Sequence, residues 1–105
     1  MFSFFKKLFS SNQPPLDELL SKGAVVVDVR TVGEFNSGHA KDSINIPLDM
    51  IASKTDSLKK YPHIIVCCAS GMRSGRAKSI LESKGFTNVT NAGSWQKVAK
   101  YVGNV

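Results

Sequence analysis

A reactive cysteine is indicated where the chain runs Cys68-Ala69-Ser70-Gly71-Met72-Arg73-Ser74, a short turn that contains a glycine and is closed by an arginine. The apolar stretch 63–67 before it favours a buried strand, and the serine and alanine residues after it begin a helix. The backbone N–H groups of such a turn converge near the helix N-terminus, where they stabilise negative charge. We therefore expect the pKa of the Cys68 thiol to be lowered and its thiolate to act as a nucleophile.

The neighbouring Cys67 is expected to be an inert core residue. It occupies the last position of the predicted strand, where consecutive side chains point to opposite faces of the sheet. A disulfide between adjacent residues would close a strained small ring, so the two cysteines predict no disulfide framework. This cysteine content favours a reducing compartment, and we expect the protein in the cytoplasm.

Other polar residues near the loop have simpler interpretations. Arg73 suits either a clamp on an anionic substrate or a pair with a carboxylate, and its position at the end of the loop favours the structural role. Ser70, Ser74 and Arg76 lie close enough in sequence to add donors, but serines at a helix start most often cap the helix. We expect none of these three residues to be essential.

The two histidines lie far apart, and together with two adjacent cysteines they give no metal-ligand spacing, so we predict no metal. His39 suits a backbone hydrogen bond across a turn or an acid–base role, whereas His63 is expected to face solvent. No glycine-rich nucleotide loop is present, and no cofactor is expected.

Short β-branched runs alternate with helical patterns along the chain. Strands are predicted over residues 24–29, 43–46, 64–67 and 88–90. Helices are predicted over residues 16–22, 31–35, 48–58, 74–84 and 95–102, the second opening on the capping box Thr31-x-x-Glu34. Strands joined by helical crossovers predict a doubly wound α/β fold, in which a mostly parallel sheet carries helices on both faces. Ligands bind such sheets at the carboxyl ends of the strands, where Cys68 lies.

Composition sets the size and the partners. The 105 residues, 42% hydrophobic and 21% charged, suffice for one modest core, and we place the domain at residues 16–105. The net charge of +6 favours small anions, without the interleaved aromatic residues that nucleic-acid binding would require. We expect a monomer.

Residues 1–15 hold a segment rich in Phe and Lys, followed by a linker that contains proline. The segment is too short to span a bilayer, and two interpretations stay open. It either lies on a membrane surface, as a peripheral contact, or packs on the exterior of the domain.

Five motifs occur in the order seen in rhodanese-like domains, a resemblance that covers residues 16 to 102. They are Asp28-Val29-Arg30, Glu34-Phe35, Gly38-His39, Asn45-Ile46-Pro47-Leu48 and Cys68-x-x-Gly71-x-Arg73-Ser74. Each motif alone is weak, but the five in order are specific. The fold that the resemblance implies is the doubly wound α/β domain that the strand and helix pattern predicts independently.

The resemblance implies sulfur transfer. The loop cysteine, matched here by Cys68, would take the outer sulfur of a donor such as thiosulfate as a persulfide and yield it to cyanide or a thiol. Backbone N–H groups of Ala69, Ser70, Gly71, Met72 and Arg73 would bind the substrate. The acceptor could also be a protein.

Three departures from the family pattern leave the sulfur donor open, and one is that residues 91–95 stand where a Gly-Gly pair is common. The residue after the cysteine is Ala69, where an arginine is frequent, and this removes a positive side chain beside the thiolate. Residues 40–43 also replace a common Ile-Pro-Gly-Ala sequence. Asp28 and Arg30 match a recurring pair, for which an internal salt bridge is a better explanation than catalysis.

Two alternatives stay open at this stage. A phosphatase or arsenate reductase would use a cysteine, five intervening residues and an arginine, a spacing that fits Cys67 and Arg73 but not Cys68. A noncatalytic rhodanese-like module would bind a partner protein with the same fold. Retention of Cys68 favours chemistry over the module.

Overall fold

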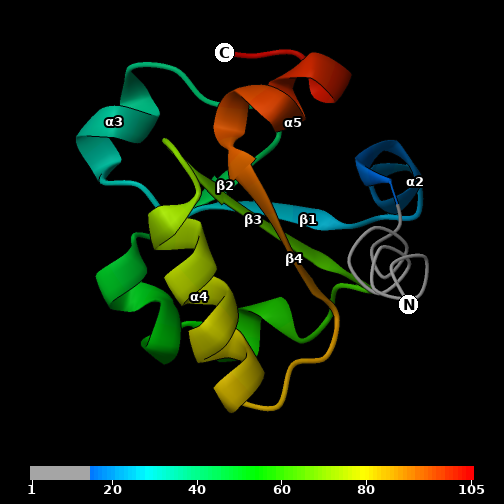
Figure 1. The fold of residues 1–105 in the computed structure, drawn as a ribbon, viewed down its shortest axis with the longest axis vertical. Coiled ribbons are helices and arrows are strands. Elements are labelled where there is room, and N and C mark those ends of the chain that lie inside the picture. The colour runs from blue at the N-terminus through cyan, green and yellow to red at the C-terminus, as the bar shows by residue number, and fades with distance from the viewer. Residues whose placement is uncertain (1–14) are drawn as a thin grey trace, which may run out of the picture.

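The computed structural model describes residues 15–105, which form one parallel four-stranded sheet packed between helices (Figure 1). The strands are β1 (Val25–Asp28), β2 (Ile44–Asn45), β3 (Ile64–Cys68) and β4 (Val89–Ser94). The helices are α2 (Leu16–Ser21), α3 (Val32–Asn36), α4 (Met72–Ser83) and α5 (Trp95–Val102), with the 3-10 helices η1 (Leu48–Ser53) and η2 (Thr55–Leu58). The sequence segment predicted to precede the domain lies outside the described residues, except for Pro15.

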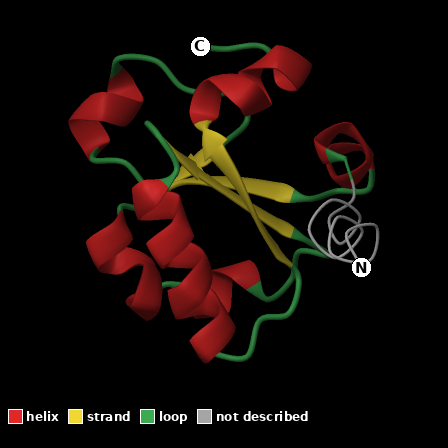
Figure 2. Ribbon diagram, viewed as in Figure 1, coloured by secondary structure: helices red, strands yellow, loops and turns green. Residues whose placement is uncertain are grey.

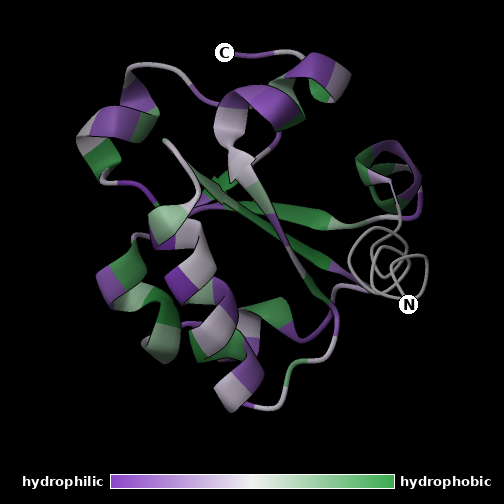
Figure 3. Cartoon of the chain, viewed as in Figure 1, coloured by the Kyte–Doolittle hydropathy of each residue, from purple (hydrophilic) through white to green (hydrophobic). Residues whose placement is uncertain are grey.

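The sheet runs in the order β2-β1-β3-β4, with every neighbouring pair parallel. Helices cover both faces: α4, η1 and η2 pack on one, and α2 and α5 on the other (Figure 2). The predicted doubly wound α/β fold is therefore confirmed. All five residues of β3 are buried, which explains why its sequence is apolar throughout (Figure 3).

Alternate residues of the strands feed two separate apolar clusters. Val27 and Val66 pack on the α4 side, whereas Val26 and Ile65 pack on the α2 and α5 side. The sheet thus needs nonpolar residues at nearly every central position. Residues that could take part in chemistry therefore lie at the ends of the strands.

Two local predictions were wrong. The helix predicted over residues 48–58 is a pair of 3-10 helices, η1 and η2, broken at Lys54. Leu48 and Ile51 are three residues apart, which is one turn of a 3-10 helix, so both side chains pack on the same apolar cluster.

His63, expected to face solvent, is half-buried, and its Nε2 lies 2.8 Å from Thr90 Oγ1 on β4. Desolvation by burial lowers the pKa of His63, and the charge of Lys78 lowers it further. This histidine therefore ties the start of β3 to β4.

A buried ion pair closes the carboxyl end of β1, as the sequence predicted. Arg30 Nη2 and Asp28 Oδ2 are 2.8 Å apart, and both side chains are almost fully buried. The same guanidinium donates to the Gly38 carbonyl at 2.7 Å and lies 4.9 Å from the centre of the Trp95 ring. One arginine thus connects β1, the turn after α3 and the start of α5.

No helix within residues 15–105 is long and apolar enough to cross a membrane.

The buried pair gives the first testable prediction. Arg30→Ala leaves the Asp28 carboxylate buried without its partner, and we expect the free energy of unfolding to fall by about 3–5 kcal/mol in urea denaturation. The control is Lys22→Ala, which removes the exposed pair between Lys22 and Glu18 and should change stability by less than about 0.5 kcal/mol. Equal losses in the two variants would contradict a structural role for Arg30.

Candidate active site

Cys68 is the last residue of β3, and its side chain is 1% exposed on the face of the sheet that α4 covers. The strand thus extends one residue further than the sequence predicted. The turn 69–71 follows, and α4 begins at Met72 instead of Ser74. The strand and the helix fix both ends of a turn of only three residues, and they hold it around the sulfur.

Two N–H donors and one hydroxyl group approach the sulfur of Cys68. The Gly71 N–H group donates to Sγ at 3.0 Å and the Ser74 N–H group at 3.4 Å, while the Ser74 hydroxyl oxygen lies 3.3 Å away. Desolvation by burial raises the pKa of the Cys68 thiol, but hydrogen bonds from Ser74, Gly71 and Ser70 together outweigh it, so the pKa lies below its usual value. The site favours a thiolate.

The backbone of Gly71 makes this arrangement sterically feasible. Its φ is +107°, in the left-handed region that glycine tolerates, and a Cβ there would lie 3.3 Å from the Cα of Gly93 on β4. Asn91 of β4 holds the same peptide, since its Nδ2 donates to the Gly71 carbonyl at 3.2 Å. A register shift in the β3–β4 pairing near Cys67 brings Gly93 to this place.

Cys67 faces the opposite side of the sheet, among the residues that α2 and α5 cover. Burial raises the pKa of its thiol to about 12, with a further contribution from the negative charge of Asp28. As the sequence analysis expected, this cysteine packs in the core. The pKa is therefore raised for Cys67 and lowered for the adjacent Cys68.

Arg73 forms a bidentate pair with Glu34 on α3, with Nη1–Oε1 and Nη2–Oε2 distances of 2.6 Å and 3.0 Å. The hydrogen bonds from Arg73 lower the pKa of the Glu34 carboxyl to about 2, assisted by the Thr31 backbone. Glu34 also completes the predicted capping box with Thr31. Arg73 therefore anchors the start of α4 to α3, and the charge of Cys68 makes a smaller contribution to the raised pKa of Arg73 than Glu34 does.

The other residues predicted to bind substrate have open surroundings. Ala69, Ser70 and Met72 are exposed, and Met72 retains 80% of its accessible surface. Of the loop N–H groups predicted to surround the sulfur, that of Gly71 donates to it at 3.0 Å. His39 makes the backbone contact considered for it, with Nδ1 2.8 Å from the Phe35 carbonyl oxygen.

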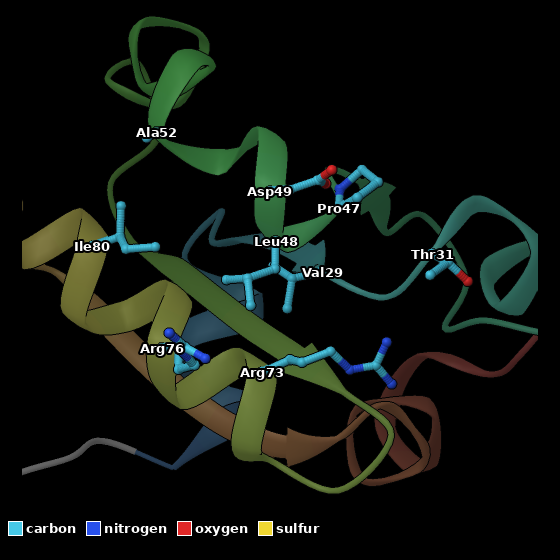
Figure 4. A pocket seen from close by; sticks show the side chains of 9 residues that line it. All are labelled: Val29, Thr31, Pro47, Leu48, Asp49, Ala52, Arg73, Arg76 and Ile80. Atoms are coloured by element: carbon cyan, nitrogen blue, oxygen red, sulfur yellow. The ribbon is translucent and has the colours of Figure 1, made fainter.

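A pocket of about 540 Å³ lies beside the loop, between α4 and η1 (Figure 4). Val29, Leu48 and Ile80 form an apolar floor, and the two arginines of α4, Arg73 and Arg76, lie along one side. Cys68 and Val29 belong to the same buried cluster. The pocket can hold an apolar group whose polar end reaches toward the arginines.

Sequence reasoning missed two residues of the site. Ser74, taken for a helix cap, is fully buried, and its hydroxyl also donates to Asn91 Oδ1 at 2.6 Å. Nothing in the sequence connects Asn91 with the cysteine loop, because Asn91 lies on β4, 23 residues after Cys68, and only the sheet pairing brings it there. The position of Ser74, six residues after the cysteine, was the available clue.

Comparison with known proteins identifies the family. The family model for the rhodanese-like domain matches residues 12–100. The chain is 35% identical over 81 residues to the thiosulfate sulfurtransferase PspE of Escherichia coli (strain K12), covering 70% of this chain and 72% of that protein. A sulfurtransferase of Allochromatium vinosum is 28% identical over 71 residues, covering 68% of this chain and 66% of that protein.

Among solved structures, the rhodanese with anions from E. coli superposes with a TM-score of 0.70 and 32% identity, covering 78% of this chain and 96% of that one. The chain belongs to the rhodanese-like domain family. Its relatives include proteins named as sulfurtransferases, which supports that general enzyme class.

The Glu34–Arg73 pair predicts an unusual titration. The Glu34 carboxyl should titrate at about 2 in NMR spectra, against 4.5 for an ordinary glutamate, and Arg73→Ala should return it toward 4.5. Because the folded-state pKa is depressed, the stabilisation is fully present above about pH 4.5 and is lost as the pH falls toward 2. A wild-type midpoint near 4.5 would show that the pair does not form in solution.

The two thiols should react differently. At neutral pH, iodoacetamide should alkylate Cys68 and leave Cys67 unmodified in the folded protein, because only the Cys68 thiol has a lowered pKa. Peptide mass mapping locates the modification. Unfolding in urea before alkylation is the control, since both cysteines should then react, and equal modification of the folded protein would refute the assignment.

Proposed function

We propose that this protein is a sulfurtransferase that carries a sulfane sulfur as a persulfide on Cys68. The observation that supports it most directly is the cluster of polar groups around one buried sulfur, in which the N–H groups of Gly71 and Ser74 donate to Sγ and the Ser74 hydroxyl lies within hydrogen-bond distance. Neutral donors fixed in place stabilise an anion without a solvent reorganisation cost. They suit a sulfur that alternates between thiolate and persulfide.

The chemistry needs no cofactor beyond the transferable sulfur. The Cys68 thiolate attacks the outer sulfur of thiosulfate, a new S–S bond forms, and sulfite leaves with the electron pair of the broken S–S bond. Cyanide or a thiolate then attacks the outer sulfur of the Cys68 persulfide. The S–S bond breaks toward Cys68, which regains its thiolate, and thiocyanate or a new persulfide departs.

Charge and shape around the loop support an anionic donor. Arg76 lines the pocket beside the loop, and no ion pair to it is formed within residues 15–105. The net charge of +6 attracts small anions toward the domain. The apolar floor of the same pocket suits the organic part of a thiol acceptor. We further propose that the protein acts as a monomer in the cytoplasm.

The phosphatase alternative is less well supported by the geometry. An oxyanion loop of that kind needs the arginine free to hold two phosphate oxygens. Arg73 instead donates to both carboxylate oxygens of Glu34, at 2.6 Å and 3.0 Å. The only thiol at the correct spacing, Cys67, faces the other side of the sheet.

Intact mass spectrometry tests the proposal. After reduction and incubation with thiosulfate, the wild type and Cys67→Ser should each gain one sulfur atom, and Cys68→Ser should gain none, because only Cys68 lies in the donor cluster. Cyanide should then remove the sulfur and release thiocyanate in a stoichiometric amount.

The outcomes separate the alternatives. Loading that survives Cys68→Ser would refute the assigned nucleophile. Absence of loading from thiosulfate, organic persulfides and polysulfide alike would refute sulfur transfer and favour a partner-binding module.

A further inference from the structure

The Ser74 hydroxyl occupies a position between two groups that compete for its single proton. It lies 3.3 Å from Cys68 Sγ on one side and 2.6 Å from Asn91 Oδ1 on the other. Ser74 is fully buried, so water does not supply a further partner. Because the hydroxyl has one proton, it can donate a hydrogen bond to only one of these two neighbours at a time.

The orientation of the Asn91 amide is fixed by its own contacts. The Gly93 N–H group donates to Oδ1 at 2.9 Å, which requires an oxygen there, and Nδ2 donates to the Gly71 carbonyl at 3.2 Å. Oδ1 is therefore an acceptor only, and the Ser74 proton points to it. The Ser74 oxygen then presents a lone pair to Cys68, suited to accept from an S–H group.

The direction of the hydrogen bond between Ser74 and Cys68 must reverse when Cys68 ionises. A thiolate accepts hydrogen bonds and donates none, so the Ser74 hydroxyl has to rotate and donate to the sulfur. When a second sulfur is bound, Sγ becomes the neutral inner atom of a persulfide, and the proton can return to Asn91. The rotation of one hydroxyl thus follows each change of charge on Sγ.

We propose that Ser74 is a catalytic residue that donates to Cys68 Sγ as it becomes the leaving thiolate, and that Asn91 is a positioning residue that holds the Ser74 hydroxyl between transfers. The inference rests on the proposed sulfur transfer. In the release step, the acceptor attacks the outer sulfur and the S–S electron pair moves to Sγ. The Ser74 O–H turns to meet that charge, and no proton leaves the serine.

Asn91 also serves the second donor, because the same amide binds the carbonyl of Gly71, whose N–H group donates to Sγ at 3.0 Å. One side chain from β4 therefore sets the position of both donors. This accounts for the close approach of the cysteine loop to β4, where a Cβ on residue 71 would lie 3.3 Å from the Cα of Gly93.

The test uses Ser74→Ala with two independent measurements. The midpoint of the pH dependence of Cys68 alkylation by iodoacetamide should move upward by about one pH unit, since a hydrogen bond to the thiolate is lost. In single-turnover release of sulfur from the preformed persulfide to cyanide, the rate constant should fall about tenfold. The matched control is Ser79→Ala, the same change on the exposed face of α4, which should alter neither quantity.

Asn91→Asp provides a second variant at an exposed position. The Ser74 hydroxyl should keep donating to the new carboxylate instead of to the sulfur. The alkylation midpoint should therefore rise for two reasons, the negative charge at position 91 and the weaker hydrogen bond from Ser74 to the thiolate. In the Ser74→Ala background the charge and the loss of the Nδ2 bond to the Gly71 carbonyl are left, and only the contribution through the hydroxyl is removed, so the shift caused by Asn91→Asp should be smaller there. Equal shifts in the two backgrounds would show that Asn91 does not act through Ser74.

The measurements distinguish this inference from the proposed function. A wild-type alkylation midpoint and release rate in Ser74→Ala would overturn the role of Ser74, even if sulfur transfer is established. If no persulfide forms in the wild type, the proposed function and the release step are both refuted. The alkylation midpoint alone then decides whether Ser74 stabilises the thiolate.

Discussion

The hydrogen bond from the Gly71 N–H group to the sulfur of Cys68 is the constraint on which the rest of the site depends. At 3.0 Å, it folds the turn back over the end of β3, and this path demands a positive φ at Gly71. The turned-back peptide then lies against Gly93, where a Cβ on residue 71 would lie 3.3 Å from the Gly93 Cα. The shifted pairing of β3 with β4, the contact of Asn91 with the Gly71 carbonyl and the early start of α4 all accommodate this one bond.

Arg30 and Arg73, which lie near the carboxyl ends of the strands, are each paired with a carboxylate. Arg30 is paired with Asp28 in the interior, and Arg73 with Glu34 at the half-buried junction of α3 and α4. The Cys68 thiolate is consequently stabilised by neutral dipoles in direct contact, with positive charge only in its surroundings. Such an arrangement holds an anion without neutralising it, and the sulfur retains the nucleophilicity that a direct ion pair would reduce.

The sequence predicted the parallel α/β fold because its apolar runs and helix ends are local signals, and it predicted the internal pairing of Asp28 with Arg30. It failed at residues 48–58, where 3-10 turns place Leu48 and Ile51 on the same apolar cluster. It also missed the contact between Ser74 and Asn91, since 17 residues separate them and the sheet register alone brings them together. Motif spacing thus points to Cys68 as the candidate residue, whereas the groups that contact its sulfur depend on tertiary structure.

The contrast between Cys67 and Cys68 follows from the pleat of a single strand. The two thiols are adjacent in sequence and both are buried, yet alternation sends one into an apolar layer near the Asp28 carboxylate and the other toward the turn. Burial alone would raise the pKa of both thiols, as it does for Cys67. At Cys68 the end of the strand lets N–H groups reach the sulfur, and their hydrogen bonds outweigh the desolvation. The lowered pKa of Cys68 is therefore a consequence of where the strand ends, and a register shift of one residue would exchange the faces on which the two cysteines lie.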